Sequence, residues 1–332
     1  MLIAEHNLNL AVTGELHKLR LAFLRALLFR NLIDLHQQIE KRLEANVESQ
    51  QELLDAGAST RQAVMQAEIQ ALNLKPSLAA YQQQYFEART QIAELIGRDM
   101  SGQPPDIERV RLPWPTGDLS YEPVELDLER ESARALKQRP DLLLLREAIE
   151  AAGAEKRMVR AGYFPFITLT ASGLLIPENV LLSRQTDVVP GRETRATEYR
   201  AGPALSWRVV DNGQVTGASR RAESVRQIYQ ITLRRLEQNV PRELARVAQT
   251  LENADARLGA LQKAVAATEE NLKLVETKVV LGEATQLDFL NAQRNLLWVR
   301  TGVLQAVYDH ASARAQLDRV TGAYLNFAGH DR

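Results

Sequence analysis

The sequence predicts a mainly α protein with a small β part: long antiparallel coiled-coil helical hairpins in two repeats, and one pair of amphipathic β-strands. Three observations lead to this fold class. Apolar residues recur every three or four positions over most of the chain, two glycine turns stand 225 residues apart, and one short region changes to a period of two. Only 5% of the 332 residues are aromatic, which suits extended helices with thin cores better than a globular interior.

The clearest element is a helical hairpin folded about Gly282. Its first arm belongs to a long helix predicted over 214–281, in which Pro241 should introduce a bend. Its second arm is a helix predicted over 285–321. The seam of this arm keeps steps of three or four residues: Phe289, Ala292, Leu296, Val299, Val303, Ala306, His310, Ala313, Leu317 and Val320. This is the seam spacing of a coiled coil, so the two arms should pack along their length.

The same hairpin recurs 225 residues earlier in the chain. Gly57 corresponds to Gly282 and Gly97 to Gly322, and no gap separates the two anchors. At this offset the seam becomes Val64, Ala67, Ala71, Leu74, Leu78, Tyr81, Tyr85, Ala88, Ile92 and Leu95. An internal duplication is the natural explanation. It divides the chain into a first-repeat hairpin (1–97) and a second repeat (139–322).

The first repeat begins with a helix from residue 4 to about 55. A turn about Gly57 follows, and Ser59 with Gln62 three residues later is a capping-box pattern that restarts the helix. The second helix ends at Gly97, and Pro76 inside it should produce a kink because proline removes a backbone donor.

The two repeats are joined by a proline-rich equatorial linker over 98–138, in which a weak helix is expected from about 126 to 137. Arg139-Pro140-Asp141 then indicates a helix start, since the missing donor of proline costs nothing there. This helix should run to about Gly162. Residues 323–332 form a tail.

Two segments of the second repeat have a strand period. Residues 164–174 carry Ile167, Leu169 and Ala171 on one face and small polar residues on the other. Residues 202–210 alternate in the same way, and their apolar positions are Leu205, Trp207 and Val209. A membrane-spanning strand needs about 9 to 11 tilted residues, so both segments are long enough. Residues 175–200 between them should form a solvated loop.

Composition excludes several functions. The net charge is −1, from 41 basic and 42 acidic residues, which argues against nucleic acid as a partner. The sequence has no cysteine, no phosphate-binding glycine loop and no protease or hydrolase motif, so we expect no enzyme activity, cofactor or metal site. His310 stands alone on a seam and should be structural. No apolar run is long enough for a transmembrane helix, and residues 1–13 lack an export-signal pattern.

Several short motifs occur in a characteristic order along the chain. They are Arg139-Pro140-Asp141-Leu142, Phe164-Pro165, Gly202-Pro203-Ala204-Leu205-Ser206-Trp207 before Asp211-Asn212-Gly213, and Leu281-Gly282-Glu283-Ala284-Thr285 before Leu287-Asp288-Phe289-Leu290-Asn291-Ala292-Gln293. With the duplication, this set resembles the TolC family of outer-membrane efflux and secretion channels over nearly the whole chain.

The resemblance implies a homotrimer in the outer membrane. Each protomer gives strands to a shared β-barrel in outer-membrane lipid and helices to a periplasmic α-barrel. The trimer is the exit duct of a tripartite efflux or type I secretion system, and receives substrate from an inner-membrane pump through a periplasmic adaptor. No catalysis is implied.

The resemblance also assigns candidate site residues. Asp288 and Asn291 match positions of the channel constriction, although Asp288 also suits a purely local role beside the helix cap Thr285. The first repeat has Ala63 and Gln66 at these positions. The adaptor-docking tips would be Ala56, Gly57, Ala58 and Ser59, and Leu281, Gly282, Glu283, Ala284 and Thr285. Glycine at a helix end is equally explained by turn geometry alone.

The 225-residue offset places Met1 opposite Arg226, inside the long helix of the second repeat. The strand pair and entering helix of the first repeat would therefore precede Met1. We accordingly predict a truncated family member that contains half of the family's barrel protomer and lacks an export signal.

Two other functions remain open from the residues alone. A soluble coiled-coil scaffold would explain the helices, but has no use for a strand pair with one apolar face. A periplasmic adaptor also carries a long hairpin, but it has one hairpin and a β-domain, whereas this chain has two hairpins and few strands.

Overall fold

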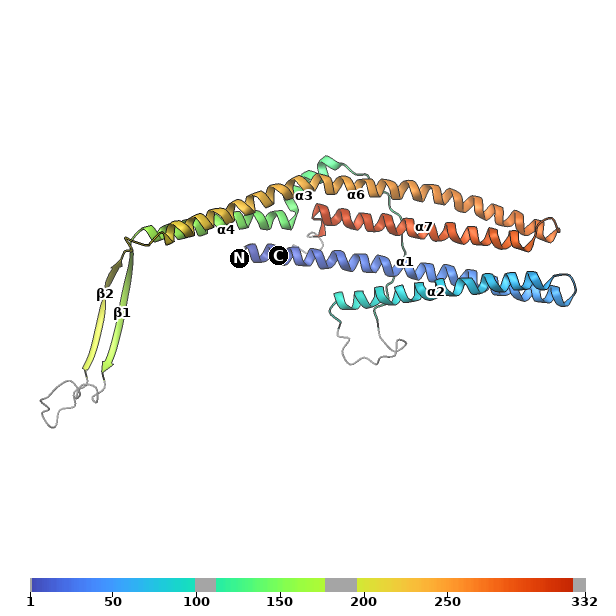
Figure 1. Cartoon of the computed structure of the whole chain (residues 1–332), viewed down its shortest axis with the longest axis horizontal. Helices are drawn as coiled ribbons and strands as arrows, with labels where there is room; N and C mark the ends of the chain where they lie inside the picture. The colour runs from blue at the N-terminus through green and yellow to red at the C-terminus, as the bar shows by residue number, and fades with distance from the viewer. Residues whose placement is uncertain (1, 99–111, 177–195, 325–332) are drawn as a thin grey trace, which may run out of the picture. The chain divides into compact units, whose positions relative to one another are not determined.

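The computed structural model describes residues 2–98, 112–176 and 196–324. The predicted linker residues 99–111, loop residues 177–195 and tail residues 325–332 lie outside these ranges. The elements are α1 (Leu2–Asp55), α2 (Arg61–Leu95), α3 (Leu128–Gln138), α4 (Pro140–Arg160), a 3-10 turn (Ala161–Tyr163), β1 (Phe166–Ile176), β2 (Ala196–Ser206), α6 (Gln214–Val280) and α7 (Gln286–Thr321) (Figure 1). The mainly α fold with one small strand pair is confirmed.

The chain forms two compact units. The helical unit consists of Met1–Leu144 and Arg234–Arg332, and the strand unit consists of Leu145–Leu233. The strand unit therefore lies within the predicted second repeat.

Two hairpins form the helical unit, and their turns are copies of each other. Gly57 has φ +75° and Gly282 has φ +77°, a left-handed conformation that glycine adopts without steric cost. Four backbone hydrogen bonds close each turn and correspond one for one at the 225-residue offset. For example, the Ala58 amide donates to the Leu53 carbonyl at 2.8 Å, and the Glu283 amide donates to the Lys278 carbonyl at 2.8 Å.

The far ends of the second arms are also copies. Gly97 and Gly322 have φ +69° and +77°. After them, Arg98 donates to the carbonyl of Ala93 at 2.9 Å and Ala323 donates to that of Asp318 at 2.8 Å. The duplication predicted from glycine spacing is therefore present in backbone geometry at both ends of the hairpin arm.

The core of the helical unit is thin and runs along α1, which packs against α2 and α7. Small residues allow α1 and α2 to approach closely, as at Ala22, Ala26 and Ala88. A second cluster joins all three helices: Ile39, Leu43, Ala71, Leu74 and Leu290. The seam predicted for α7 is confirmed, because most of its residues are buried. The seam residues of α6 beyond Leu258 are only half-buried in the single chain.

The predicted cap of α2 is wrong by one residue. Thr60, in extended backbone immediately before the helix, accepts a hydrogen bond from the Ala63 amide at 3.2 Å. Ser59 belongs to the turn, and its hydroxyl donates to Gln50 Oε1 at 2.9 Å. The helix continues past Pro76 from Arg61 to Leu95.

Arginines from both hairpins hold the non-helical segment 112–126 onto the helical unit. Arg89 donates to the carbonyls of Leu112 at 3.0 Å and Pro113 at 2.9 Å. Its repeat equivalent, Arg314, forms an ion pair with Glu122. This pair of equivalent arginines explains why segment 112–126 has fixed contacts although it has no regular structure.

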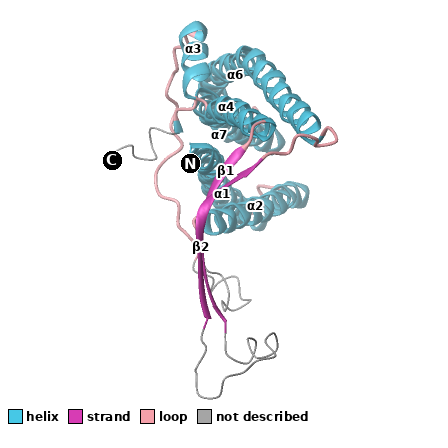
Figure 2. Cartoon of the chain, turned by 90° about the vertical axis from the view of Figure 1, so that its left-hand side faces the viewer, coloured by secondary structure: helices cyan, strands magenta, loops and turns pink. Residues whose placement is uncertain are grey.

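The strand unit contains an antiparallel pair, β1 and β2 (Figure 2). Its register places Ile167 opposite Leu205, so the predicted apolar positions of the two strands share one face. The predicted bounds of the second strand are wrong. β2 covers Ala196–Ser206 rather than 202–210, so Trp207 and Val209 lie beyond its end, and part of the predicted loop is strand.

Proline explains where the ladder stops. Phe166 pairs with Ser206, and the next residue on the first strand is Pro165, which has no N–H to donate to Trp207. At the other end, pairing with β1 extends β2 back to Ala196, whose neighbours show little alternation of polarity.

Candidate functional site

Asp288 lies at the start of α7 and forms a reciprocal capping box with Thr285. The Asp288 amide donates to Thr285 Oγ1 at 3.2 Å, and the Thr285 amide donates to Asp288 Oδ2 at 2.9 Å. The Thr285 hydroxyl also donates to Asp288 Oδ2 at 2.6 Å. The local role predicted for Asp288 is therefore present, and its carboxylate remains exposed to solvent.

These hydrogen bonds have an electrostatic consequence. The Thr285 hydroxyl, followed by the Thr285 amide, lowers the pKa of Asp288 below its ordinary value of 3.8. A lowered pKa in the folded state means that the carboxylate stabilises the start of α7 above about pH 4, and that this contribution is lost as the pH falls through the folded-state pKa.

We therefore expect Asp288→Asn to remove an acid-dependent step from the stability of this helix end. Amide hydrogen exchange at Thr285 and Asp288, measured as a function of pH, should show faster opening of the wild-type turn at low pH and little change in the variant. Glu283→Gln is the matched control, since Glu283 is exposed in the same tip. Equal pH dependence in Asp288→Asn and wild type would contradict the assignment.

Asn291 is half-exposed one turn further along α7, and its Oδ1 accepts a hydrogen bond from Arg294 Nη2 at 3.2 Å. In the first repeat, Thr60 is equivalent to Thr285 and Ala63 to Asp288. Thr60 therefore caps α2 without an acidic partner. Of these two equivalent capping positions, only that of the second hairpin carries a carboxylate.

Both tips lie at the same end of the helical unit (Figure 1). Ala56, Gly57, Ala58, Leu281, Gly282, Glu283 and Thr285 are exposed, and Ser59 and Ala284 are half-buried. Gln286 Nε2 donates to Asn46 Oδ1 at 2.9 Å and so ties the start of α7 to α1. Leu53 and Leu281, side chains beside the two turns, are exposed apolar groups.

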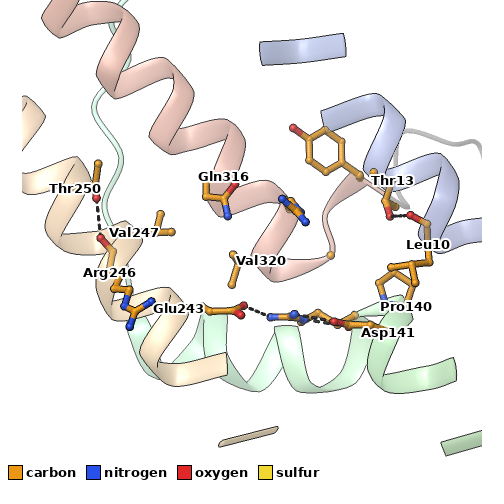
Figure 3. Close-up of a pocket in the computed structure, with 15 residues that line it drawn as sticks. Leu10, Thr13, Pro140, Asp141, Glu243, Arg246, Val247, Thr250, Gln316 and Val320 are labelled. Atoms are coloured by element: carbon orange, nitrogen blue, oxygen red, sulfur yellow. Dashed lines mark hydrogen bonds and ion pairs between the residues drawn. The ribbon is translucent and has the colours of Figure 1, made fainter. Parts of the chain in front are cut away.

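A polar cluster at the other end of the helical unit was missed by sequence reasoning. Arg139 is only 9% exposed, and its Nη2 lies 2.8 Å from Asp141 Oδ2 while its Nη1 lies 2.5 Å from Glu243 Oε2 (Figure 3). It lines a cavity of about 600 Å³ with Thr13, Gln316 and Tyr324. The Arg139-Pro140-Asp141 motif therefore links the start of α4 to α6 as well as starting a helix.

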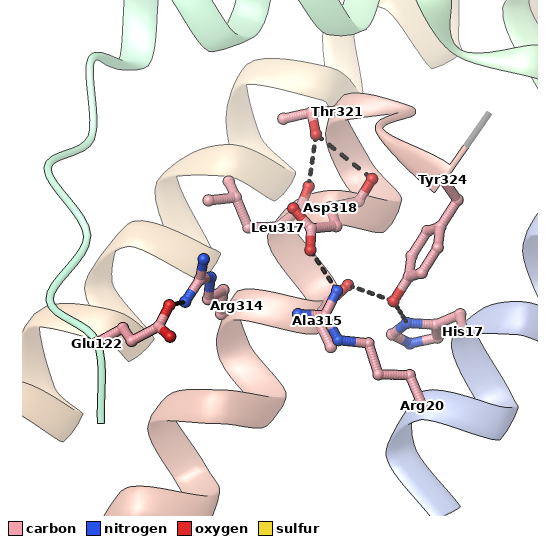
Figure 4. A network of polar contacts seen from close by, with 9 residues as sticks. All are labelled: His17, Arg20, Glu122, Arg314, Ala315, Leu317, Asp318, Thr321 and Tyr324. Carbon is pink, nitrogen blue, oxygen red and sulfur yellow. Dashed lines mark hydrogen bonds and ion pairs between the residues drawn. The ribbon is translucent and has the colours of Figure 1, made fainter. Parts of the chain in front are cut away.

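A second missed network joins α1 to the end of α7 (Figure 4). His17 Nδ1 lies 3.3 Å from the hydroxyl of Tyr324, which donates to the Ala315 carbonyl at 3.2 Å. Arg20 forms an ion pair with Asp318. Burial, together with the nearby Arg319 charge, lowers the pKa of His17, so the ring is neutral at pH 7.

With this geometry established, comparison with known proteins identifies the family. Residues 132–323 match the family model described as outer membrane efflux protein. The chain belongs to the outer membrane efflux protein family. This membership does not favour the alternatives of a coiled-coil scaffold or a periplasmic adaptor.

Two curated relatives align with most of the chain. The outer membrane efflux protein BepC of Brucella suis biovar 1 (strain 1330) is 26% identical over 324 residues, which is 96% of this chain and 63% of BepC. Nodulation protein T of Rhizobium leguminosarum bv. trifolii is 22% identical over 291 residues, which is 85% of this chain and 59% of that protein. The chain thus spans about three fifths of these relatives' length.

Three solved structures of outer-membrane or transmembrane-channel proteins share the fold. The outer-membrane channel OprN superimposes with a TM-score of 0.73 at 19% identity, over 97% of this chain and 68% of OprN. VceC from Vibrio cholerae gives 0.74 at 18% identity, over 97% of this chain and 72% of VceC. CusC gives 0.75 at 18% identity, over 97% of this chain and 71% of CusC.

His310 of this efflux-family chain is a packed residue. Its ring is 1% exposed, lies 4.8 Å from the Tyr121 ring, and has Nε2 at 3.3 Å from Asp255 Oδ1. Burial is the main cause of its lowered pKa. Within 2–98, 112–176 and 196–324, no three His, Cys, Asp or Glu side chains are grouped as a metal site. In the same ranges no helix has the length and apolar character to cross a membrane.

Proposed function

We propose that this chain is a subunit of an outer-membrane exit duct in a tripartite efflux or type I secretion system. The duct is a homotrimer that takes substrate from an inner-membrane pump through a periplasmic adaptor. Family membership supports the class of protein. The single observation that carries the proposal is the strand pair, because the large side chains on its apolar face are exposed to solvent.

The apolar face is built by the register of β1 and β2. Ile167, Leu169 and Ala171 lie opposite Leu205, Pro203 and Ala201. Leu169 is 81% exposed, and Ile167 and Leu205 beside it are 74% and 69% exposed. An uncovered apolar face in water is unfavourable by about 25 cal/mol per Å², whereas lipid removes that cost. The other face carries Thr168, Thr170 and Ser172, which suit a water-filled lumen.

Aromatic side chains stand at both ends of this apolar face. Tyr199 packs over Gly173, where an added Cβ would lie 3.3 Å from the tyrosine ring. Trp207 follows the other end of β2 and donates from Nε1 to the Tyr163 carbonyl at 3.2 Å. At about 3.4 Å per residue, Tyr199 lies roughly 24 Å along β2 from Ser206, and Trp207 is the next residue. Outer-membrane strands have an apolar band about 25 Å tall between aromatic girdles.

The hairpin tips take the roles of channel entrance and docking site in this proposal. Their turns are exposed, rigidly closed by backbone hydrogen bonds, and flanked by exposed Leu53 and Leu281, as a docking surface for a helical adaptor requires. In a trimer, the exposed Asp288 would contribute three carboxylates at the constriction. The adjacent Asn291 adds no charge to it.

The experiment places a charge on either face of the strand pair. Leu169→Arg should prevent assembly in the outer membrane, because an arginine on the lipid face at the bilayer midplane costs about 2–4 kcal/mol. Thr170→Arg, one residue away on the opposite face, should be tolerated. Both variants are produced from the native gene in the host cells, and outer-membrane content is measured by fractionation with detection of the trimer.

In a strain that lacks the gene, Thr170→Arg should restore efflux and Leu169→Arg should not. Equal membrane content of Leu169→Arg and Thr170→Arg would contradict a lipid-facing role for the apolar face. Recovery of the wild-type protein only in the soluble fraction would contradict the proposed function itself.

A further inference from the structure

The strand unit carries a cluster of basic side chains where the strands meet the helices. Residues 155–163 and 207–223 contain six basic and three acidic residues. This bias is local, since the whole chain has a net charge of −1. The six basic residues are Lys156, Arg157, Arg160, Arg208, Arg220 and Arg221.

Two of the three acidic side chains in these segments accept hydrogen bonds from neighbouring groups. Asp211 accepts hydrogen bonds from the amides of Gly213 at 3.0 Å and Val215 at 2.7 Å, so it caps α6. Glu223 accepts from Lys156 Nζ at 2.5 Å. The third acid, Glu155, is exposed on α4. Arg157, Arg160, Arg220 and Arg221 are exposed, and none of them forms an ion pair with any acid in the described ranges.

Side-chain contacts hold the end of α4 beside the start of α6, so these arginines lie near the same ends of two neighbouring helices. The Tyr163 hydroxyl lies 2.8 Å from Thr216 Oγ1, and Arg160 Nε donates to Ser219 Oγ at 3.4 Å. At 1.5 Å per residue, Arg157 is about 5 Å from the end of α4, and Arg221 is about 11 Å from the start of α6. The four arginines therefore lie within about 11 Å, along the helix axes, of the helix ends that adjoin the strands. We call Arg157, Arg160, Arg220 and Arg221 the arginine band.

Apolar and aromatic side chains separate the arginine band from the strands. Phe164 and Trp207 are exposed, and the Trp207 indole is anchored to the Tyr163 carbonyl. Aromatic rings of this kind gather at the level of lipid headgroups. The headgroup layer adds about 5 to 8 Å on each side of the hydrocarbon core, so long arginine side chains reach it from the helix ends.

We propose that the arginine band binds the phosphate headgroups of anionic phospholipids at the membrane face from which the strands emerge. The inference rests on the proposed membrane location of the strand pair, and adds a ligand class to it. Guanidinium groups match phosphate oxygens in bidentate geometry. Adjacency to the exposed apolar strands selects a lipid headgroup over a free phosphate ion, because only a lipid occupies both surfaces together.

The test compares the natural protein with a variant in which all four arginines are changed to glutamine. A matched control changes Arg42, Arg61, Arg242 and Lys263 to glutamine, which removes the same charge from exposed positions of the helical unit. Binding is measured by flotation with vesicles of phosphatidylcholine alone, or of phosphatidylcholine with one third phosphatidylglycerol. Inorganic phosphate at the same phosphate concentration is the competitor. Insertion is followed separately, by protection of the strand pair from protease.

The wild-type protein and the matched control should bind the phosphatidylglycerol vesicles at least tenfold more tightly than the neutral ones. The arginine-band variant should lose this preference, and free phosphate should not compete. The proposal is overturned if the variant keeps the preference, if the wild type has none, or if free phosphate abolishes binding. Loss of strand protection in every vesicle, with the lipid preference retained, would instead contradict the proposed function.

Discussion

Gly322→Ala is expected to destabilise the helical unit by about 2–4 kcal/mol. Gly322 has φ +77°, a left-handed conformation that costs an L side chain such as alanine roughly 1–2 kcal/mol. An added Cβ would also lie 3.2 Å from the carbonyl carbon and oxygen of Gln138 and 3.3 Å from the amide nitrogen of Arg139. These are backbone atoms at the junction of α3 and α4, so they cannot rotate away, and overpacking of this kind costs about 1–3 kcal/mol.

The duplication supplies a matched control for this prediction. Gly97 has φ +69° at the equivalent position of the first repeat, and nothing lies within 4 Å of its added Cβ. Gly97→Ala should therefore cost only the backbone term of about 1–2 kcal/mol. Urea denaturation of the two variants, followed by helical circular dichroism, measures the difference. Equal losses of stability would show that the α3–α4 junction does not press on Gly322.

Arg139→Met is expected to cost about 2–4 kcal/mol of stability. Removing one partner of a buried ion pair costs about 3–5 kcal/mol, and the value is smaller here because Glu243 is partly exposed. The loss should come from the carboxylates of Asp141 and Glu243, which are left without their cation. The loss of stability is measured by urea denaturation followed by helical circular dichroism, as for Gly322→Ala.

A double variant distinguishes lost charge pairing from lost packing. Arg139→Met with Glu243→Met should recover part of the stability, because one uncompensated carboxylate is removed. Arg242→Met, at an exposed neighbouring position of α6, should have little effect. If the double variant is as unstable as the sum of the two single variants, the ion pair is not the origin of the loss.

The helical part of the fold could be predicted well because two local signals agree along it. Seam spacing located the buried face of α7, and the paired glycines located the turns, since few residues other than glycine adopt a left-handed backbone. Because of the duplication, the seam and the turn of the second hairpin also predict those of α1 and α2. The cap of α2 was misplaced by one residue because Ser59 and Thr60 are both good caps, and only backbone geometry separates them.

The strand pair could be predicted only in part. Alternation identified the apolar positions of β1, but Ala196–Arg200 alternate poorly and become strand because β1 pairs with them. At the other end, Trp207 and Val209 continue the alternation but lie beyond the ladder, which stops where Pro165 has no donor. Tertiary pairing therefore set these bounds against the local pattern.

The polar clusters could not be predicted, because their partners are far apart in sequence. Arg139 and Glu243, or His17 and Tyr324, belong to helices whose register is set only by packing. The capping box at Asp288 was predictable because it is local. Its role at a channel constriction stays a prediction.

The most direct test of the proposed function is single-channel conductance in a planar bilayer. Trimers of the natural protein should produce discrete ion-conducting steps. Asp288→Asn should raise the conductance or weaken block by cations, because in the proposed trimer it would remove three carboxylates from the predicted constriction. A protein that inserts into the bilayer as a trimer and never conducts would contradict the assignment of this chain to an exit duct.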